Sequence, residues 1–271
     1  MESPWHGALR RFFPSRRVRS PAVAPDGLRI YAIGDMHGRA DLLDALLCHI
    51  RADQGETEVR VVGLGDYVDR GRQSRETLDL LVDLGGDSRI GSEFLMGNHE
   101  EVLLAFLDEP GEGPLWCDFG GRETLASYGV AAPSDRSDMA GWIAARNAFA
   151  TALPQSHYDL LRSLKTSTEA GGYFFAHAGV RPGVPLEEQS QRDLLWIREP
   201  FLRSNGALER VVVHGHTPAE APHSDHRRVG VDTGAYLTGV LTAVRLEAEA
   251  RTWIQASAGA DGSISISERV A

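Results

Sequence analysis

Three stretches decide the fold, and each places a glycine and polar residues directly after a short apolar run. They are Leu28–Gly38 (LRIYAIGDMHG), Val59–Gly71 (VRVVGLGDYVDRG) and Phe94–Glu100 (FLMGNHE). Short apolar runs bounded by glycine are typical of buried strands. Between these runs apolar residues recur at helical spacing, which predicts helices over 39–52 and around 78–82. The alternation of strands and helices predicts a mostly parallel sheet with right-handed crossovers.

The remaining chain extends this pattern around a helical segment. A single domain is expected over 28–271, with a helical insert at about 101–170, after a basic and flexible extension over 1–27 that holds five arginines. The expected strands are 28–33, 59–64, 94–96, 173–176, 211–213, 229–231 and 239–246, with one or two edge strands within 251–266.

Charge and cysteine content limit the partners and the compartment. The 271 residues carry 28 Lys+Arg against 38 Asp+Glu, a net charge of −10 at pH 7. A broad surface for nucleic acid or anionic membrane needs positive charge, so neither partner is expected. No apolar run approaches the length of a membrane span. Cys48 and Cys117 are the only cysteines, which predicts reduced thiols and a cytoplasmic protein.

Five of the expected strands run into polar clusters. Ligands of open α/β sheets gather at the carboxyl ends of the strands, so these clusters are expected to meet in one crevice. Carboxylate oxygens and imidazole nitrogens suit Mn, Fe and Zn ions, and six such donors fit two ions that share one carboxylate. The donors that the sequence offers are Asp35, His37, Asp66, Asn98, His177 and His216.

The ordered blocks GDMHG, GDYVDRG, GNHE, HAG and GHTP closely resemble the phosphoprotein phosphatase family of binuclear metallophosphoesterases, in its bacterial serine/threonine phosphatase form. The resemblance implies the calcineurin-like metallophosphoesterase fold, an α/β four-layer αββα sandwich with the metal site at the C-terminal edge of the sheets. The metal ligands that it implies are Asp35 and His37 for the first ion, Asp66 as the bridge, and Asn98, His177 and His216 for the second.

The same resemblance implies which residues act on the substrate. His99 matches the general acid that protonates the leaving oxygen, and Asp69 matches the carboxylate that holds this histidine. Arg70 and Arg198 match phosphate-binding arginines, and Asn98 and His99 are also expected to contact the phosphate. The implied reaction is hydrolysis by direct attack of a metal-bridging hydroxide, with manganese as the favoured metal and iron or zinc as alternatives.

The substrate is less sharply indicated than the reaction. A serine/threonine protein phosphatase is favoured, because this chain keeps Asp69 and has Glu100 at two positions where symmetrical diadenosine tetraphosphatases typically differ. The alternatives are such a dinucleoside polyphosphate hydrolase or a broad hydrolase of small phosphoesters. A metal-binding regulator without turnover is disfavoured, since every expected ligand and the acid are present.

Several residues outside the predicted ligand set also have an expected position or role. His214 alternates with His216 along a strand and is expected on the opposite face. Glu100 is expected at a helix start, where the helix dipole favours a carboxylate. The segment Trp116–Val130 resembles one that recurs in bacterial members and is expected to wall one side of the cleft. Arg181 is ranked below Arg198 as a phosphate ligand. Surface positions are expected for His6, His49, His157, His223 and His226.

Overall fold

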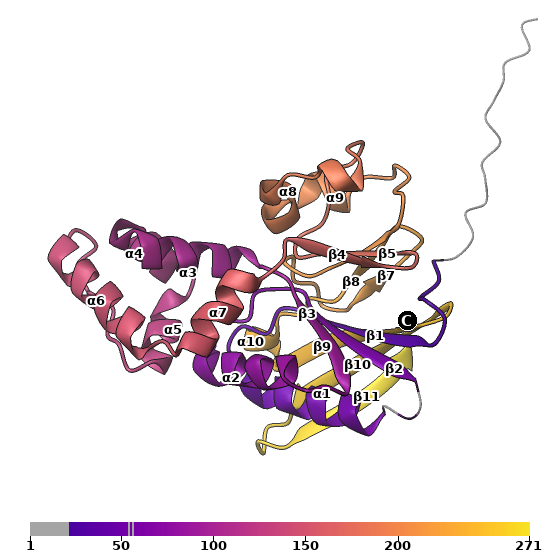
Figure 1. Ribbon diagram of the computed structural model, residues 1–271, viewed down its shortest axis with the longest axis horizontal. Helices are drawn as coiled ribbons and strands as arrows, with labels where there is room; N and C mark the ends of the chain where they lie inside the picture. The colour runs from indigo at the N-terminus through magenta and orange to yellow at the C-terminus, as the bar shows by residue number, and fades with distance from the viewer. Residues whose placement is uncertain (1–21, 54, 56) are drawn as a thin grey trace, which may run out of the picture.

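Two β-sheets packed face to face form the centre of the protein, seen in a computed structural model that describes residues 22–53, 55 and 57–271 (Figure 1). The six-stranded sheet has the order β11-β10-β9-β1-β2-β3 and the five-stranded sheet the order β4-β5-β6-β8-β7. The first sheet contains β1 (Leu28–Ile33), β2 (Glu58–Gly63), β3 (Ile90–Phe94), β9 (Val240–Glu247), β10 (Ala250–Ala258) and β11 (Ile264–Val270). The second contains β4 (Ser167–Ala170), β5 (Tyr173–Ala176), β6 (Val211–His214), β7 (His223–Ser224) and β8 (Arg228–Gly230).

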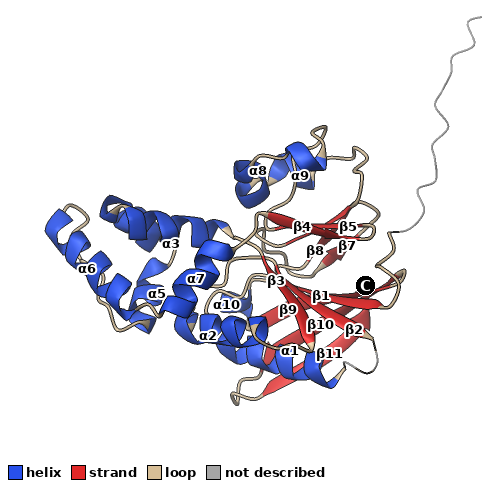
Figure 2. Ribbon diagram, in the orientation of Figure 1, coloured by secondary structure: helices blue, strands red, loops and turns tan. Residues whose placement is uncertain are grey.

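Helices cover the outer face of each sheet, and the predicted four-layer αββα sandwich is confirmed (Figure 2). The six-stranded sheet carries α1 (Ala40–Ala52) and α2 (Ser74–Gly85), and the five-stranded sheet carries α8 (Gln191–Trp196) and α9 (Glu199–Leu202). The short helix α10 (Ala235–Thr238) precedes β9. No helix in the described part of the chain is long and apolar enough to cross a membrane.

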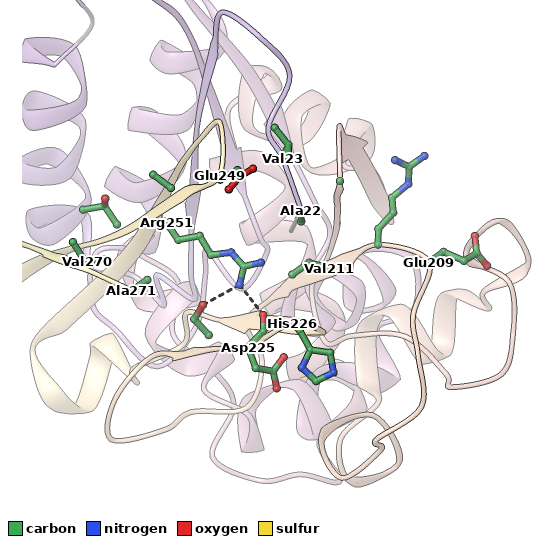
Figure 3. Close-up of a pocket in the computed structure, with 15 residues that line it drawn as sticks. Ala22, Val23, Glu209, Val211, Asp225, His226, Glu249, Arg251, Val270 and Ala271 are labelled. Atoms are coloured by element: carbon green, nitrogen blue, oxygen red, sulfur yellow. Dashed lines mark hydrogen bonds between the residues drawn. The ribbon is translucent and has the colours of Figure 1, made fainter. Parts of the chain in front are cut away.

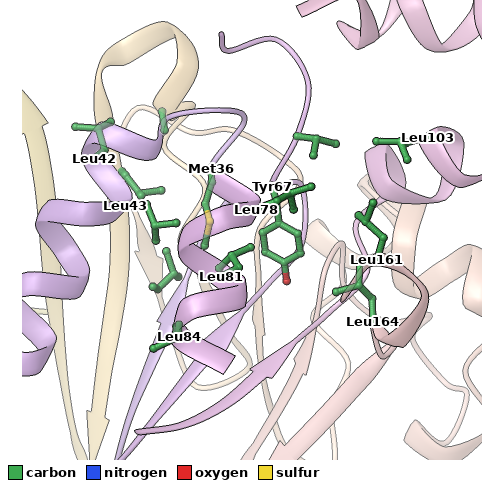
Figure 4. Packing of buried hydrophobic residues seen from close by; sticks show 14 of the residues in the cluster. Met36, Leu42, Leu43, Tyr67, Leu78, Leu81, Leu84, Leu103, Leu161 and Leu164 are labelled. Carbon is green, nitrogen blue, oxygen red and sulfur yellow. The ribbon is translucent and has the colours of Figure 1, made fainter. Parts of the chain in front are cut away.

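The alternation of side chains along β1 explains why the strand lies between two apolar layers. Ile30 and Ala32 face the second sheet, whereas Tyr31 and Ile33 pack in the cluster beneath the helices. Successive strand residues point to opposite faces, so a strand that is covered on both sides is apolar at nearly every position. Figure 4 shows Leu42 and Leu43 of α1 in this cluster, as the helical spacing predicts.

The helical insert stands beside the sandwich (Figure 1), and its aromatic side chains continue the buried cluster that lies beneath α1 and α2. Its helices are α3 (Asn98–Asp108), the 3-10 turn Pro110–Glu112, α4 (Gly113–Asp118), α5 (Gly121–Ser127), α6 (Met139–Ala152) and α7 (Gln155–Ser163). The ring of Phe106 lies 5.0 Å from that of Trp116, 6.3 Å from that of Trp142 and 6.5 Å from that of Phe149, measured between centroids.

Three edge strands differ from the sequence prediction, and one of them, the two-residue β7, was not expected at all. The strand expected at 94–96 runs over Ile90–Phe94, and its Gly91, Ser92 and Glu93 gave no apolar run. Residues 167–170, expected within the helical segment, form β4 at the edge of the second sheet. An edge strand is less buried than a central one, so its sequence is more polar and its signal weaker.

The described part of the chain begins six residues before β1, at Ala22. Ala24 is buried, and its backbone N–H donates to the carbonyl of Ala248. Residues 22–27 of the predicted extension therefore pack against the sandwich, while residues 1–21 lie outside the described part of the chain.

Truncation of Phe106 tests the aromatic core of the insert. Phe106→Ala is expected to lower the free energy of unfolding by about 3–5 kcal/mol, because it leaves a cavity among three aromatic rings. Urea denaturation measures this change. Leu237→Ala is the control, since Leu237 is 79% exposed, and its effect should stay within about 0.5 kcal/mol. Equal effects of the two substitutions would contradict the packing described.

Candidate metal centre

Loops from both sheets meet at one edge of the sandwich. Asp35 follows β1, Asp66 follows β2, and Asn98 follows β3, while His177 and His216 follow β5 and β6 of the second sheet. The strands pair in parallel within each set, so their carboxyl ends lie side by side. The fold thereby brings together donors that are separated by up to 181 residues in the sequence.

The backbone of these loops adopts an uncommon conformation. Among the described residues six that are not glycine have a positive φ, and five of them belong to the expected site: His37, Asp66, Asp69, Arg70 and His216. The left-handed region costs such a residue of order 1–3 kcal/mol and persists only where surrounding contacts enforce it. Strain of this kind clusters at functional sites, and no sequence pattern revealed it.

Glu100 supplies much of the enforcing contact. Its carboxylate accepts hydrogen bonds from the backbone N–H groups of Asp66 at 2.8 Å, Tyr67 at 2.8 Å, Val68 at 3.2 Å and Gly97 at 3.0 Å. Glu100 is fully buried in the first turn of α3, and burial raises the pKa of its carboxyl to about 7. The helix start was predicted, but the role as an anchor of the loop after β2 was missed, because the partners lie more than 30 residues away.

The carboxylate of Asp66 is shared by two groups of potential metal ligands. His37, Asp66 and His99 form one group, and Asp66, His177 and His216 form the other, with the ligand atoms of each group within 4.8 Å of one another. Asp66 Oδ2 lies 3.5 Å from His37 Nε2, and Asp66 Oδ1 lies 3.4 Å from His177 Nε2. Each oxygen of Asp66 therefore faces a different group.

Asn98 lies beside one of these groups of potential ligands, whereas Asp35 belongs to neither. Asn98 Oδ1 is 3.0 Å from His177 Nε2, so its amide belongs to the second group. Asp35 lies outside both groups, and its two oxygens accept from the backbone N–H of His216 at 3.0 Å each. The neighbouring Asp232 is buried and accepts from Gly234 N–H at 2.8 Å. The charges of Asp232 and Asp66 add to burial in raising the pKa of Asp35.

The donor set fits divalent cations. Burial raises the pKa of Asp66, because the negative charge of its carboxylate is disfavoured there. Burial also lowers the pKa of His37 and lowers that of His177 to about 3, so both imidazoles stay neutral. His216 Nε2 is buried and has no hydrogen-bond partner among the described residues. Neutral imidazole nitrogens beside carboxylates, without thiolates, are a ligand set for Mn, Fe or Zn, and bound cations compensate the buried carboxylates.

His99 and Asp69 form a buried pair at the edge of this site. His99 Nδ1 lies 2.7 Å from Asp69 Oδ2, and its Nε2 faces the crevice, 3.9 Å from Asp66 Oδ2. Burial lowers the pKa of His99 to about 3 and raises that of Asp69 to about 7. The hydrogen bond fixes the orientation of the imidazole ring, since Nδ1 is engaged and Nε2 alone is directed towards the donor groups.

Two arginines direct positive charge into the crevice. The guanidinium of Arg70 lies over the ring of Tyr236, 4.9 Å from its centroid. Arg198 donates to Thr217 Oγ1 at 3.4 Å, and after burial the charges of Arg70 and Arg198 both lower the pKa of His99. Arg181, the less favoured phosphate ligand, is instead paired with Asp193 at 2.5 Å.

Histidines outside the two groups have structural surroundings. His214 is buried on the other face of β6, where its ring lies edge-to-face with Phe201 at 5.1 Å, as predicted. The surface position predicted for His157 is wrong, because α7 packs on α2 and buries the ring. His157 bonds there to Tyr128 Oη at 2.8 Å and Asp79 Oδ1 at 2.9 Å. His49 and His223 are half-buried and His226 is exposed, while His6 lies outside the described residues.

A separate hollow of about 1020 Å³ lies near the starts of β6 and β10 (Figure 3). Ala22, Val211 and Arg251 line it, and the guanidinium of Arg251 donates to Ser224 Oγ and to the carbonyl of Asp225. None of the predicted site residues borders this hollow. The predicted donors instead follow the carboxyl ends of the strands.

Comparisons with known proteins identify related sequences and folds. The family described as calcineurin-like phosphoesterase matches residues 28–241. The chain is 27% identical to a symmetrical bis(5'-nucleosyl)-tetraphosphatase of Neisseria gonorrhoeae, over 85% of this chain and 97% of that protein. It is 26% identical to serine/threonine-protein phosphatase 2 of Salmonella typhimurium, over 80% and 93%. A cold-active protein-tyrosine phosphatase of a Shewanella species has a similar fold, with a TM-score of 0.54 and 20% identity over 90% and 83%.

Metal content tests the shared role of Asp66. After loading with Mn²⁺ and gel filtration, the wild-type chain is expected to retain about two ions, the number that one shared carboxylate can serve. Asp66→Asn is expected to retain fewer than one, because both groups lose a charged oxygen. Plasma emission spectrometry measures the content. His223→Ala is the matched control and should retain both ions. Full occupancy in Asp66→Asn would contradict the assignment.

Proposed function

The chain belongs to the calcineurin-like phosphoesterase family, and from that premise we propose that it hydrolyses phosphate monoesters on serine and threonine residues of proteins. Family membership makes it a metallophosphoesterase. The observation that carries the finer proposal is the buried pair of His99 and Asp69, with Nδ1 and Oδ2 2.7 Å apart and with His99 Nε2 3.9 Å from Asp66 Oδ2.

The residues of the crevice divide the reaction among them. The proposed ligands are Asp35, His37, Asp66, Asn98, His177 and His216, and the carboxylate of Asp35 also accepts the backbone N–H of His216. Two divalent cations held there would polarise the phosphoryl group and lower the pKa of a bound water. The guanidinium groups of Arg70 and Arg198 would bind phosphate oxygens in a fork.

His99 moves the proton that the leaving group needs. The negative charge of a bound phosphate would oppose the arginine charges that help to lower the pKa of His99, and the imidazolium would then donate Nδ1–H to Asp69 and Nε2–H to the oxygen that leaves phosphorus. A serine or threonine side chain leaves as a poorly stabilised alkoxide, so protonation of that oxygen lowers the barrier strongly. The buried carboxylate of Asp69 stabilises the imidazolium. The pair therefore suits alkyl phosphate esters, which phosphoproteins carry.

The surroundings of Arg70 favour a single phosphate group over a chain of phosphates. A hollow of about 350 Å³ beyond Arg70 is lined by Phe119 and Tyr236 and by two acidic residues, Asp118 and Glu123. Asp118 is paired with Arg136, so the carboxylate of Glu123 would repel further phosphates that extend there, whereas an uncharged or basic peptide would not be repelled. The similarity to a relative named serine/threonine-protein phosphatase 2 supports the same substrate class.

Hydrolysis of symmetrical dinucleoside tetraphosphates is the second candidate function. The relative from Neisseria gonorrhoeae carries that name, and the match extends over 97% of its length. Both candidate reactions would use the same donor groups, and they differ in the leaving group and in what the crevice accepts beyond the first phosphate.

Removal of metal tests the hydrolase chemistry. Chelation followed by desalting is expected to abolish turnover of 4-nitrophenyl phosphate, and Mn²⁺ is expected to restore it, because the buried carboxylates and imidazoles have no substitute for the cations. Release of nitrophenolate measures the rate. A chelated protein that keeps its full rate would contradict a metal-dependent mechanism.

A direct comparison of substrates distinguishes the two candidates. A phosphothreonine peptide and diadenosine tetraphosphate are offered at equal concentration to the Mn²⁺-loaded protein. We expect kcat/KM for the peptide to be higher by at least about tenfold, equivalent to about 1.4 kcal/mol of transition-state stabilisation. Phosphate release and nucleotide chromatography measure the two rates. A preference for the dinucleotide would assign the second function instead.

A further inference from the structure

The helical insert does more than stand beside the crevice, because two of its side chains hold Asp69. The indole Nε1–H of Trp116 in α4 donates to both oxygens of Asp69, at 2.9 and 3.1 Å. The hydroxyl of Thr124 in α5 donates to Asp69 Oδ1 at 2.6 Å and accepts the backbone N–H of the same residue at 2.9 Å. Thr124 thus fixes the main chain and the side chain of Asp69 at once.

These contacts leave the Asp69 carboxylate little freedom. Asp69 is 0% exposed, and three side-chain donors surround it: the ring of His99, the indole of Trp116 and the hydroxyl of Thr124. Its backbone has a positive φ of 72°, which local contacts must enforce. Because donors lie on both sides of the Asp69 carboxylate, the plane of this group is fixed. The fixed plane sets the direction of the hydrogen bond to His99 Nδ1, and therefore the direction in which His99 Nε2 points.

The aromatic core of the insert makes this support rigid. Trp116 is fully buried, with its ring 5.0 Å from Phe106 and 5.8 Å from Phe149. Trp142 is fully buried in the same core, yet its indole N–H has no partner among the described residues. Of these two tryptophans only Trp116 connects the core to the crevice, so the pair offers a matched comparison.

We propose that Trp116 and Thr124 are positioning residues, through which the folded insert orients the Asp69–His99 pair for proton donation to the leaving oxygen. The assignment rests on the proposed role of His99. It makes proton donation, but not phosphate binding, depend on the insert. 4-Nitrophenolate is a good leaving group whose oxygen needs little protonation, whereas the oxygen of phenolate needs more. A loss of proton donation therefore slows phenyl phosphate hydrolysis more, and a loss of phosphate binding slows the hydrolysis of both aryl phosphates.

The test compares Trp116→Phe, Thr124→Val, Thr124→Ser and the control Trp142→Phe in the Mn²⁺-loaded protein, on phenyl phosphate and 4-nitrophenyl phosphate. Trp116→Phe and Thr124→Val are expected to lower kcat on phenyl phosphate by about tenfold or more, part of the 10²–10⁴-fold that general acid catalysis provides. KM and the 4-nitrophenyl phosphate rate should change by less than about threefold, since phosphate binding is untouched. Thr124→Ser should recover most of the lost rate, and Trp142→Phe should retain both rates.

Three outcomes overturn the proposal in distinguishable ways. Equal losses on both substrates, or the same pattern in Trp142→Phe, would show that the insert acts only on stability. If His99→Asn discriminates between the substrates but Trp116→Phe and Thr124→Val do not, the insert has no part in positioning. If His99→Asn itself fails to discriminate, its role as the acid is wrong, and the assignment falls with that part of the proposed function.

Discussion

The burial of the Asp66 carboxylate between the imidazoles of His37 and His177 is the interaction on which the rest of the structure depends. Its two oxygens face different groups of donors, 3.5 and 3.4 Å from the nearest ring nitrogens. A buried carboxylate without a compensating charge is unfavourable, so this arrangement calls for cations on both sides. The residue holds this position in a left-handed conformation, because Glu100 and Gly97 fix the loop around it.

The two-sheet architecture is what makes such a site possible. The loops of the six-stranded sheet supply the whole of the first group, whereas the second group combines Asp66 with His177 and His216 of the other sheet. The loops must approach so closely that a Cβ atom at Gly97 would overlap the carboxylate of Asp66, and one at Gly215 would overlap that of Asp35. Glycine is therefore required at both positions for a steric reason. The insert then adds two side-chain donors to the carboxylate of Asp69, the indole of Trp116 and the hydroxyl of Thr124.

The sequence was sufficient for the parts of the fold that have strong local signals. Apolar runs located β1, β2, β5, β6 and β9, and the resemblance carried by the five ordered blocks implied the sandwich. Edge strands such as β4 were missed, since their exposed side chains carry no apolar pattern. The donors could be named because each follows a strand directly. The anchoring by Glu100, the contacts of Trp116 and Thr124 with Asp69, and the burial of His157 depend on partners distant in sequence, which periodicity and spacing do not reveal.

Electron paramagnetic resonance of the Mn²⁺-loaded protein tests most directly whether the carboxylate of Asp66 serves two metal positions. Two Mn²⁺ ions joined by a shared carboxylate are exchange-coupled, and we predict a broad multiline spectrum whose intensity varies with temperature as a coupled pair requires. A spectrum composed only of the six-line signal of isolated Mn²⁺, at full occupancy of both positions, would contradict this role of Asp66.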